Sequence, residues 1–288
     1  MRLPHACAPQ LKLQHCIMFI RYYLHINLSM PRFLHLFSMA GIAEMMCKYG
    51  AGDKVLQLDN LDPFGFTEHY GVTEKFSDVN DLIRRAIELE PEYDYVIIHD
   101  FVEFKYHFTP SKLIFVFHGS KLRNMAQKDI DKYSKWPCYI TTQDLWEQMP
   151  NATYLPNMVD LELFYDIKYE PEEKRTYLCI NRKNDRKFIE KRIRERYPDI
   201  EYFERNNNNF IRYQDMPDFL TQYTDYVDIK FTYDDPPRTL PYPSCTGLQA
   251  LALGMDVHDK DGNLLDRKLL IVHGAKYVVE RFLKDWVS

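Results

Sequence analysis

The sequence predicts an α/β fold built from two halves, each a parallel sheet covered by helices. From Met30 onward, short apolar segments with strand character alternate with helix-like segments, a pattern typical of parallel sheets with helical crossovers. A charged connector, residues 170–174, divides these segments into two sets. Polar residues or glycine directly follow several predicted strands, as they do at the ligand-binding edge of such sheets.

In the first half, apolar runs predict strands at residues 32–37, 54–58, 95–98, 113–117 and 138–141. A short helix is expected at residues 42–49, where Gly50 ends it. Apolar residues at helical spacing predict an amphipathic helix that begins at Asp78 or Asn80. These apolar residues are Val79, Leu82, Ile83, Ala86 and Ile87. Another helix is expected to start at Thr142 or Asp144.

In the second half, strands are expected at residues 176–180, 201–203 and 226–231. Helices are expected at residues 188–197, after Pro217, from Ser244 or Thr246 to Gly254, and at 278–287. Ser244 and Thr246 are helix-capping residue types, and Gly254 is a typical C-terminal stop. The last helix is amphipathic and needs an apolar surface on which to pack.

Composition limits the functions that the chain can have. Its 288 residues carry a net charge of −5, which argues against broad nucleic-acid binding. No apolar run reaches the roughly 18 residues that a membrane span needs. The six cysteines are scattered, several of them in apolar segments, which predicts reduced, buried thiols. We therefore expect a cytoplasmic protein.

Residues 1–29 differ from the rest, because they are rich in His and Cys and contain no acidic residue. We expect a disordered leader or a start codon assigned too early, with Met30 as the true start. A targeting peptide is one alternative, although its apolar region is short and interrupted. A metal site is the other, although the spacing fits no familiar zinc pattern; its ligands would be His5, Cys7, His15 and Cys16.

Two segments carry a family resemblance. Residues 155–164 read Leu-Pro-Asn-Met-Val-Asp-Leu-Glu-Leu-Phe, and residues 249–254 read Gln-Ala-Leu-Ala-Leu-Gly within a predicted helix. In this order and spacing they resemble the GT-B glycosyltransferases of the family 4-like group (group 1), which includes sucrose synthases and bacterial mannosyltransferases. The resemblance covers residues 30–288.

The resemblance implies two Rossmann-like domains that face a cleft. Residues 30–158 would form the acceptor domain and residues 159–275 the nucleotide-sugar donor domain. Residues 276–288 would form a crossover helix that returns to the first domain. The chain departs from the family pattern in its short length and in a glycine-rich turn reduced to Gly41. Two family glutamates, eight positions apart, correspond here to Pro241 and Gln249.

The donor diphosphate needs positive charge and backbone amides. A basic loop follows the strand at residues 176–180, and the resemblance assigns diphosphate contacts to Arg182 and Lys187, with Arg186 as the alternative to Lys187. The N-terminus of a helix favours anions, so Ser244, Thr246, Gly247 and Gln249 of the helix predicted in the second half are further candidates. Gly41, in the turn after the first predicted strand, is another, because a glycine lets the backbone approach a phosphate. A solvated basic turn and an ordinary capped helix are the structural alternatives.

Polar residues at two neighbouring strand ends are the candidate catalytic groups. His99 and Asp100 follow one strand and His118 follows the next, where a His can exchange a proton near neutral pH and an Asp can orient it or act as a base. Ser120 and Arg123 are candidate contacts on the acceptor side. The basic stretch at residues 121–136 also allows weak peripheral membrane contact, although Asp129 and Asp131 dilute it and favour a solvated helix face.

These features predict a hexosyltransferase-like enzyme that uses a UDP-, GDP- or ADP-linked sugar without a metal or other cofactor. Its acceptor would be a sugar, lipid or protein, and retention of configuration is implied by the resemblance. A GT-B protein that binds a nucleotide or glycan without turnover is one alternative. An NAD-dependent Rossmann enzyme is another, with Asp59 as the ribose-binding acid. A metal-dependent GT-A enzyme is disfavoured because Asp234 and Asp235 are adjacent, not spaced as Asp-x-Asp.

Overall fold

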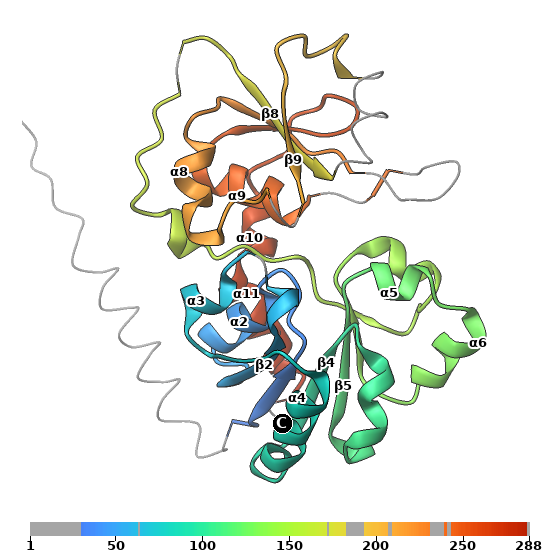
Figure 1. The fold of residues 1–288 in the computed structure, drawn as a ribbon. Coiled ribbons are helices and arrows are strands. Elements are labelled where there is room, and N and C mark those ends of the chain that lie inside the picture. Colours follow the sequence, from blue (N-terminus) through green and yellow to red (C-terminus); the bar gives the residue numbers. More distant parts are fainter. Residues whose placement is uncertain are drawn as a thin grey trace, which may run out of the picture.

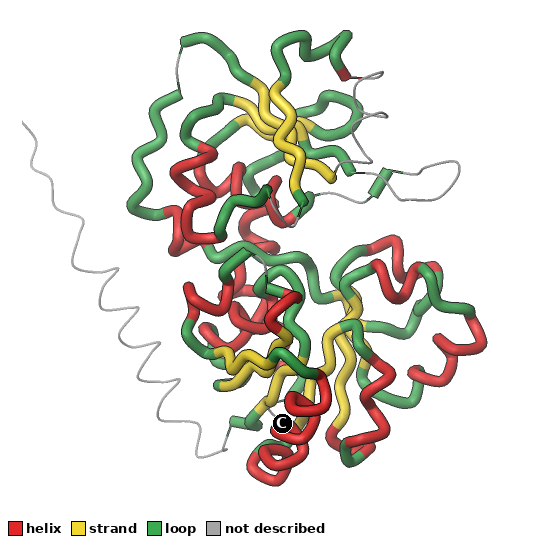
Figure 2. Tube along the Cα trace, viewed as in Figure 1, coloured by secondary structure: helices red, strands yellow, loops and turns green. Residues whose placement is uncertain are grey.

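The computed structural model has an α/β fold with two parallel sheets, and helices lie against both (Figures 1 and 2). The structure describes residues 30–62, 64–171, 173–182, 193–206, 209–230, 239–240 and 243–286. The predicted leader, residues 1–29, lies outside this description. The Rossmann-like α/β class expected from the sequence is confirmed. We call the chain around the first sheet the first half and the chain around the second sheet the second half.

The first sheet has seven parallel strands in the order β3-β2-β1-β4-β5-β6-β7. Their bounds are β1 Phe33–Leu36, β2 Lys54–Leu58, β3 Thr73–Phe76, β4 Tyr95–His99, β5 Leu113–Phe117, β6 Cys138–Ile140 and β7 Thr153–Tyr154. The strand order reverses between β1 and β4, and open α/β sheets bind ligands outside the carboxyl ends of strands at such a point. The ends of β1, β4 and β5 are therefore the place to look for a site.

The helices of the first half are α2 (Ile42–Lys48), α3 (Phe66–Tyr70), α4 (Val79–Leu89), α5 (Ser120–Arg123) and α6 (Gln127–Ile130). Asp78 caps α4 by accepting the amides of Asn80 and Asp81, so the helix begins where the first of the two predicted caps stands. The segment expected to be a helix after Thr142 is a short 3₁₀ turn. The edge strands β3 and β7 were not expected, because they lack the apolar runs of the central strands.

The second sheet has the order β11-β10-β8-β9 and is also parallel. Its strands are β8 Tyr177–Arg182, β9 Glu201–Arg205, β10 Asp225–Val227 and β11 Asp256–His258, and its helices are α8 (Met216–Leu220), α9 (Cys245–Leu253) and α10 (Leu269–His273). Strand β10 is shorter than the expected 226–231. The helix expected at residues 188–197 lies mostly outside the described residues. No described helix has the length and apolar character needed to cross a membrane.

The last helix, α11 (Ala275–Lys284), packs on the first sheet, as expected (Figure 1). Its buried face joins the core cluster that contains Phe33, Ile97 and Val116. Beyond the helix, the Trp286 indole N–H donates to the Tyr139 hydroxyl at 3.0 Å. The C-terminal segment thereby completes the core of a sheet whose first strand lies some 240 residues earlier in the chain.

The chain crosses between the halves at two segments that lie side by side. Val159 and Gly274 form a parallel bridge. The Val159 amide donates to the His273 carbonyl at 2.9 Å, and the Ala275 amide donates to the Val159 carbonyl at 2.8 Å. The two connections are thus hydrogen-bonded to each other, close to the domain boundaries that the sequence predicts.

Asp160, the aspartate of the 155–164 motif, is fully buried beside this crossing. Its carboxylate accepts hydrogen bonds from Lys48 Nζ at 2.7 Å, the Tyr49 hydroxyl at 2.7 Å and the Tyr70 hydroxyl at 2.9 Å. Burial alone would raise the pKa of Asp160, but these three donors outweigh it and lower the pKa. The Tyr70 hydroxyl also lies 3.1 Å from that of Tyr213 in the second half.

Replacement Asp160→Asn is expected to lower the free energy of unfolding by about 2–3 kcal/mol, because one amide oxygen cannot satisfy three buried donors. Urea denaturation near neutral pH measures this. The difference is expected to shrink below about pH 4, since an Asp with a lowered pKa contributes stability above its unfolded-state value and loses it as the pH falls.

The matched control is Glu162→Gln, which removes the other carboxylate that pairs with Lys48. Because Glu162 is about half exposed, its loss is expected to cost less than about 1 kcal/mol. Equal losses in the two variants would contradict the role assigned to Asp160.

Candidate functional site

A cavity of about 320 Å³ lies between the carboxyl ends of the two sheets, and residues from both halves line it. The first half contributes residues from the segments that follow β1, β4 and β5, together with Glu44 of α2. Those that follow the strands are Ser38, Gly41, Asp100, His118 and Arg123. The second half contributes Arg205, Lys230, Ser244, Cys245, Thr246 and Gln249. Seven of the residues expected from the sequence therefore meet here: Gly41, Asp100, His118, Arg123, Ser244, Thr246 and Gln249.

Three histidines, on or directly after neighbouring strands, form a continuous series that ends at the cavity. His35 Nδ1 lies 3.1 Å from His99 Nε2, and His99 Nδ1 lies 2.9 Å from His118 Nε2. His99 has no exposed surface and does not line the cavity, so its place is behind His118. Burial lowers the pKa of His35 to about 4, that of His118 to about 3, and that of His99 well below its ordinary value.

Asp100 stands at the end of β4 with φ of 58°, a backbone conformation that non-glycine residues seldom adopt. Its Oδ1 accepts the His118 amide at 2.9 Å, so it holds the β5 end against the β4 end. Burial raises the pKa of Asp100 to about 6, although the His118 amide partly offsets this. A strained, buried acid that lines a cavity is a combination found at functional sites.

Some backbone amides at the start of α9 already donate hydrogen bonds to side chains of the protein. First-turn amides have no acceptor within a helix, and here the Ser244 hydroxyl accepts the Gly247 amide at 3.0 Å. The Ser244 amide itself donates to Asp228 Oδ2 at 2.7 Å. A Cβ on Gly247 would overlap the Asp228 carboxylate, so Gly247 makes room for this acid and does not line the cavity.

Gly41 and Arg123 are also engaged with the protein. Gly41 has φ of 73°, and a Cβ there would overlap the ring of Phe66, so packing requires this glycine. Arg123 Nε donates to Asp144 Oδ2 at 2.7 Å, and Nη2 donates to Asp144 Oδ1 at 3.1 Å and to Thr142 Oγ1 at 3.0 Å. Arg123 is thus held by an ion pair at the cavity wall.

Only the start of the predicted basic loop falls within the described residues. Arg182 is the last residue of β8, at the carboxyl edge of the second sheet, but its side chain is not described. Arg186 and Lys187 lie outside the described residues. Ser120 is the first residue of α5, and its side chain is likewise outside the description.

Sequence reasoning missed two cations, Arg205 and Lys230, and two acids, Glu44 and Asp62. Arg205 pairs in register with Arg182 at the end of β9, and Lys230 lies three residues after β10; both line the cavity. Glu44 is buried in α2 and accepts hydrogen bonds from the hydroxyls of Ser38 and Thr73. Burial raises its pKa. The position of Arg205 just after a predicted strand could have identified it, whereas Lys230 lies within the predicted strand 226–231 and carried no such signal.

A second hollow, of about 760 Å³, adjoins the cavity on the first half, and the two share Met39 and Asp100. Apolar groups, among them Phe101 and Met125, and the charged side chains of Lys121 and Asp129 line it. Asp59, the ribose-binding acid of the dehydrogenase alternative, is exposed and lines neither hollow. Within the described ranges, no three or more His, Cys, Asp or Glu side chains are grouped to hold a metal ion.

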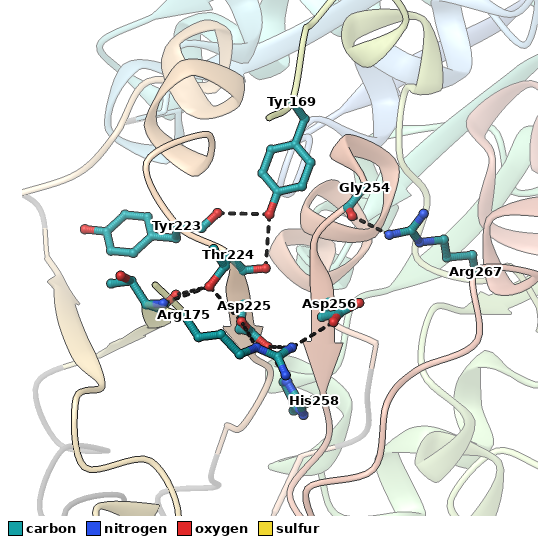
Figure 3. Close-up of polar contacts among 10 residues, drawn as sticks. Tyr169, Arg175, Tyr223, Thr224, Asp225, Gly254, Asp256, His258 and Arg267 are labelled. Carbon is teal, nitrogen blue, oxygen red and sulfur yellow. Dashed lines mark hydrogen bonds and ion pairs between the residues drawn. The ribbon is translucent and has the colours of Figure 1, made fainter. Parts of the chain in front are cut away.

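A second polar cluster lies at the opposite, amino edge of the second sheet (Figure 3). Buried Asp225 opens β10 and accepts hydrogen bonds from Arg175, Thr224 and His258 on its two oxygens. Arg175 also pairs with Asp256, the first residue of β11. Because the Asp225 carboxylate is fully used and stands at the edge away from the cavity, this cluster joins strands and is not a candidate site.

The chain matches no protein-family model, and no curated protein matches it.

Replacement Asp100→Asn is expected to stabilise the fold near pH 7 by about 1–3 kcal/mol, because it removes a buried charge and keeps an acceptor for the His118 amide. An acid with a raised pKa favours the folded state below its unfolded-state value and loses this contribution as the pH rises. The gain should therefore vanish near pH 4 and level off above about pH 6. Urea denaturation across this range measures it.

The exposed Asp59→Asn controls for the change in net charge and is expected to shift stability by less than about 0.5 kcal/mol at each pH. A pH-independent difference between Asp100→Asn and the unchanged chain would show that the Asp100 carboxyl does not titrate as described.

Proposed function

We propose that the chain is a GT-B glycosyltransferase whose two domains face a cleft and bind a nucleoside diphosphate sugar in the 320 Å³ cavity. One observation carries the proposal. The second half lines this cavity with the cations Arg205 and Lys230 and a helix start. The first half lines it with an imidazole, three carboxyl groups and one cation, Arg123, whose charge is paired with Asp144. A sugar diphosphate presents this division of charge, with an anionic leaving group at one end and hydroxyls at the other.

The diphosphate would lie against Arg205 and Lys230, joined by Arg182 and by Lys187 or Arg186 from the predicted basic loop. Charge-assisted hydrogen bonds to phosphate favour such groups, and they can stabilise the charge that develops on the leaving group without a metal. Asp228 is already at the start of α9 and would repel an anion there. The cations are therefore assigned more of the diphosphate binding than the helix amides of Ser244 and Thr246.

The donor's nucleoside would lie near Gln249, which lines the cavity in place of the family glutamate. Its amide can hydrogen-bond a ribose hydroxyl but adds no charge. On the other wall, Asp100 and His118 would contact the donor sugar and the acceptor, and the acceptor would occupy the 760 Å³ hollow that shares Asp100. Arg123 and Ser120 would then border the acceptor. Retention of configuration is the outcome we propose.

A cytoplasmic location is part of the proposal, and the buried free thiols of Cys47, Cys138 and Cys179 support it. Weak peripheral contact with membranes through residues 121–136 also stays a proposal. The second candidate function is a nucleotide- or glycan-binding protein without turnover. Gln249 and Pro241 in place of two carboxylates favour it, because the contacts that a carboxylate makes with sugar hydroxyls would be lost.

Thermal unfolding of the full chain with UDP, GDP, ADP and NAD tests the donor site. One nucleoside diphosphate is expected to raise Tm, and Arg205→Ala and Lys230→Ala are each expected to weaken its binding roughly tenfold to hundredfold, through the loss of charged contacts. Arg267→Ala is the matched control, because Arg267 donates to the Gly254 carbonyl at the far end of α9 and lines neither hollow (Figure 3).

The other possible results of this experiment distinguish the alternative functions. A shift with NAD alone would support the dehydrogenase, and no shift with any diphosphate would reject the donor site. Binding of a diphosphate without transfer or hydrolysis of the matching sugar nucleotides would favour the binding protein.

A further inference from the structure

The series His35–His99–His118 joins three adjacent strands, from the interior of the first sheet to the cavity. His35 lies on β1 and His99 ends β4, which pairs with β1 on one side and β5 on the other. His118 follows β5 directly. The rings stack in sequence, with centroids 5.4 Å and 5.2 Å apart and interplanar angles of 29° and 17°. Facing ring nitrogens lie 3.1 Å apart between His35 and His99 and 2.9 Å apart between His99 and His118.

The inner end of the series fixes where the first proton lies. His35 Nε2 is 2.6 Å from the carbonyl oxygen of Ala51. A carbonyl only accepts hydrogen bonds, so Nε2 must carry a proton and donate it. Gly52 follows with φ of 118°, and a Cβ there would lie 2.8 Å from His35 Nε2. This glycine keeps the turn tight enough for the Ala51 carbonyl to reach the ring.

The remaining protons follow from this one when the rings are neutral. A neutral imidazole has one donor and one acceptor nitrogen. With its proton on Nε2, His35 accepts at Nδ1, so His99 Nε2 donates and His99 Nδ1 accepts. His118 Nε2 must then donate to His99, and the lone pair of His118 is left on Nδ1. Because Nε2 is occupied inside the series, Nδ1 is the nitrogen that His118, a lining residue, offers to the cavity.

A positive charge on His99 would reverse the outer contact, since an imidazolium donates from both nitrogens. The surroundings oppose that charge. His35 and His99 have no exposed surface, and no described carboxylate lies within 4.0 Å of a ring nitrogen of the three histidines. Asp53 is the acid that acts on His35 electrostatically, but its side chain is 58% exposed and pairs with Arg32. Asp100 meets His118 through the backbone amide.

We infer that His35 and His99 are positioning residues that fix His118 in one tautomer, with an acceptor lone pair on Nδ1 toward the cavity. The ligand group that fits this nitrogen is a hydrogen-bond donor such as a sugar hydroxyl. A phosphate oxygen does not fit, because two acceptors repel. The inferred tautomer does not depend on the proposed function. Only the identification of the hydroxyl with a transferase substrate rests on the proposed function. His118 would then orient that hydroxyl by accepting its hydrogen bond.

Nitrogen-15 NMR of the full chain labelled at histidine tests the tautomer, because protonated and unprotonated ring nitrogens differ in chemical shift. His118→Gln assigns the His118 signals, and His107→Gln, at an exposed position outside the series, serves as the labelling control. Near pH 7, His118 is expected as a single tautomer protonated on Nε2. A proton on Nδ1, on both nitrogens, or in exchange between the two overturns the inference.

Two substitutions of His99 separate positioning from packing. His99→Leu removes the donor and acceptor, and His118 is then expected to lose its single tautomer. His99→Gln restores one donor and one acceptor on a planar group and is expected to recover it. If His99→Leu does not fold, the spectrum of the unchanged chain and the His99→Gln variant still decide. An unaltered His118 spectrum in folded His99→Leu would remove the positioning role.

The kinetic readout depends on the proposed function. With a sugar nucleotide that is turned over, His99→Leu is expected to lower kcat roughly tenfold to hundredfold through loss of substrate orientation, while the Kd of the nucleoside diphosphate stays within about twofold. His99→Gln should recover most of kcat. If His118 has the expected tautomer but no sugar is transferred, the transferase proposal is refuted and the tautomer inference stands. If sugar is transferred but His118 has the opposite tautomer, the tautomer inference is refuted and the transferase proposal stands.

Discussion

The arrangement of the cavity depends on one buried carboxylate, Asp160. It stands where the chain first crosses between the halves and takes donors from two helices of the first half. One of these donors, the Tyr70 hydroxyl, also meets Tyr213, whose amide donates to the Phe64 carbonyl at 2.7 Å. Because a buried charge is tolerated only when it is well paired, this geometry has little freedom. It thereby fixes how the cations of one sheet stand opposite the polar strand ends of the other.

The fold and part of the site were predictable from local patterns. Caps such as Asp78 and Ser244, and polar groups just after apolar strands, are encoded within a few residues and were identified from them. The histidine series could not be found in this way. His35, His99 and His118 come together only through the register of three strands, and the sequence does not reveal which residues pair. Asp228 is similar, because its role depends on a helix that begins 17 residues later. Arg205 and Lys230 resemble any other surface cation until the sheet brings them to one edge.

Two acids that line the cavity cost the fold more stability than the acid at the opposite edge of the second sheet. Asp100 holds a strained backbone and a raised pKa, and Glu44 is buried with two hydroxyl partners. Neither arrangement favours stability at neutral pH, whereas the Asp225 cluster at the opposite edge satisfies every oxygen of its carboxylate (Figure 3). Asp225 is thus fully paired where it joins strands, whereas Asp100 combines a strained backbone with a raised pKa where it lines the cavity. This contrast is typical of functional sites.

The return of α11 to the first sheet has a consequence for biosynthesis. Domains usually fold as they leave the ribosome, the N-terminal one first. Here the face of β1, β4 and β5 that α11 covers stays open to water until residues 275–286 have been translated. The half of the protein that is made first is therefore completed last. During that interval, an apolar surface that includes Phe33 and Val116 is available to chaperones, and a premature stop near the end of translation would damage the earliest part of the molecule.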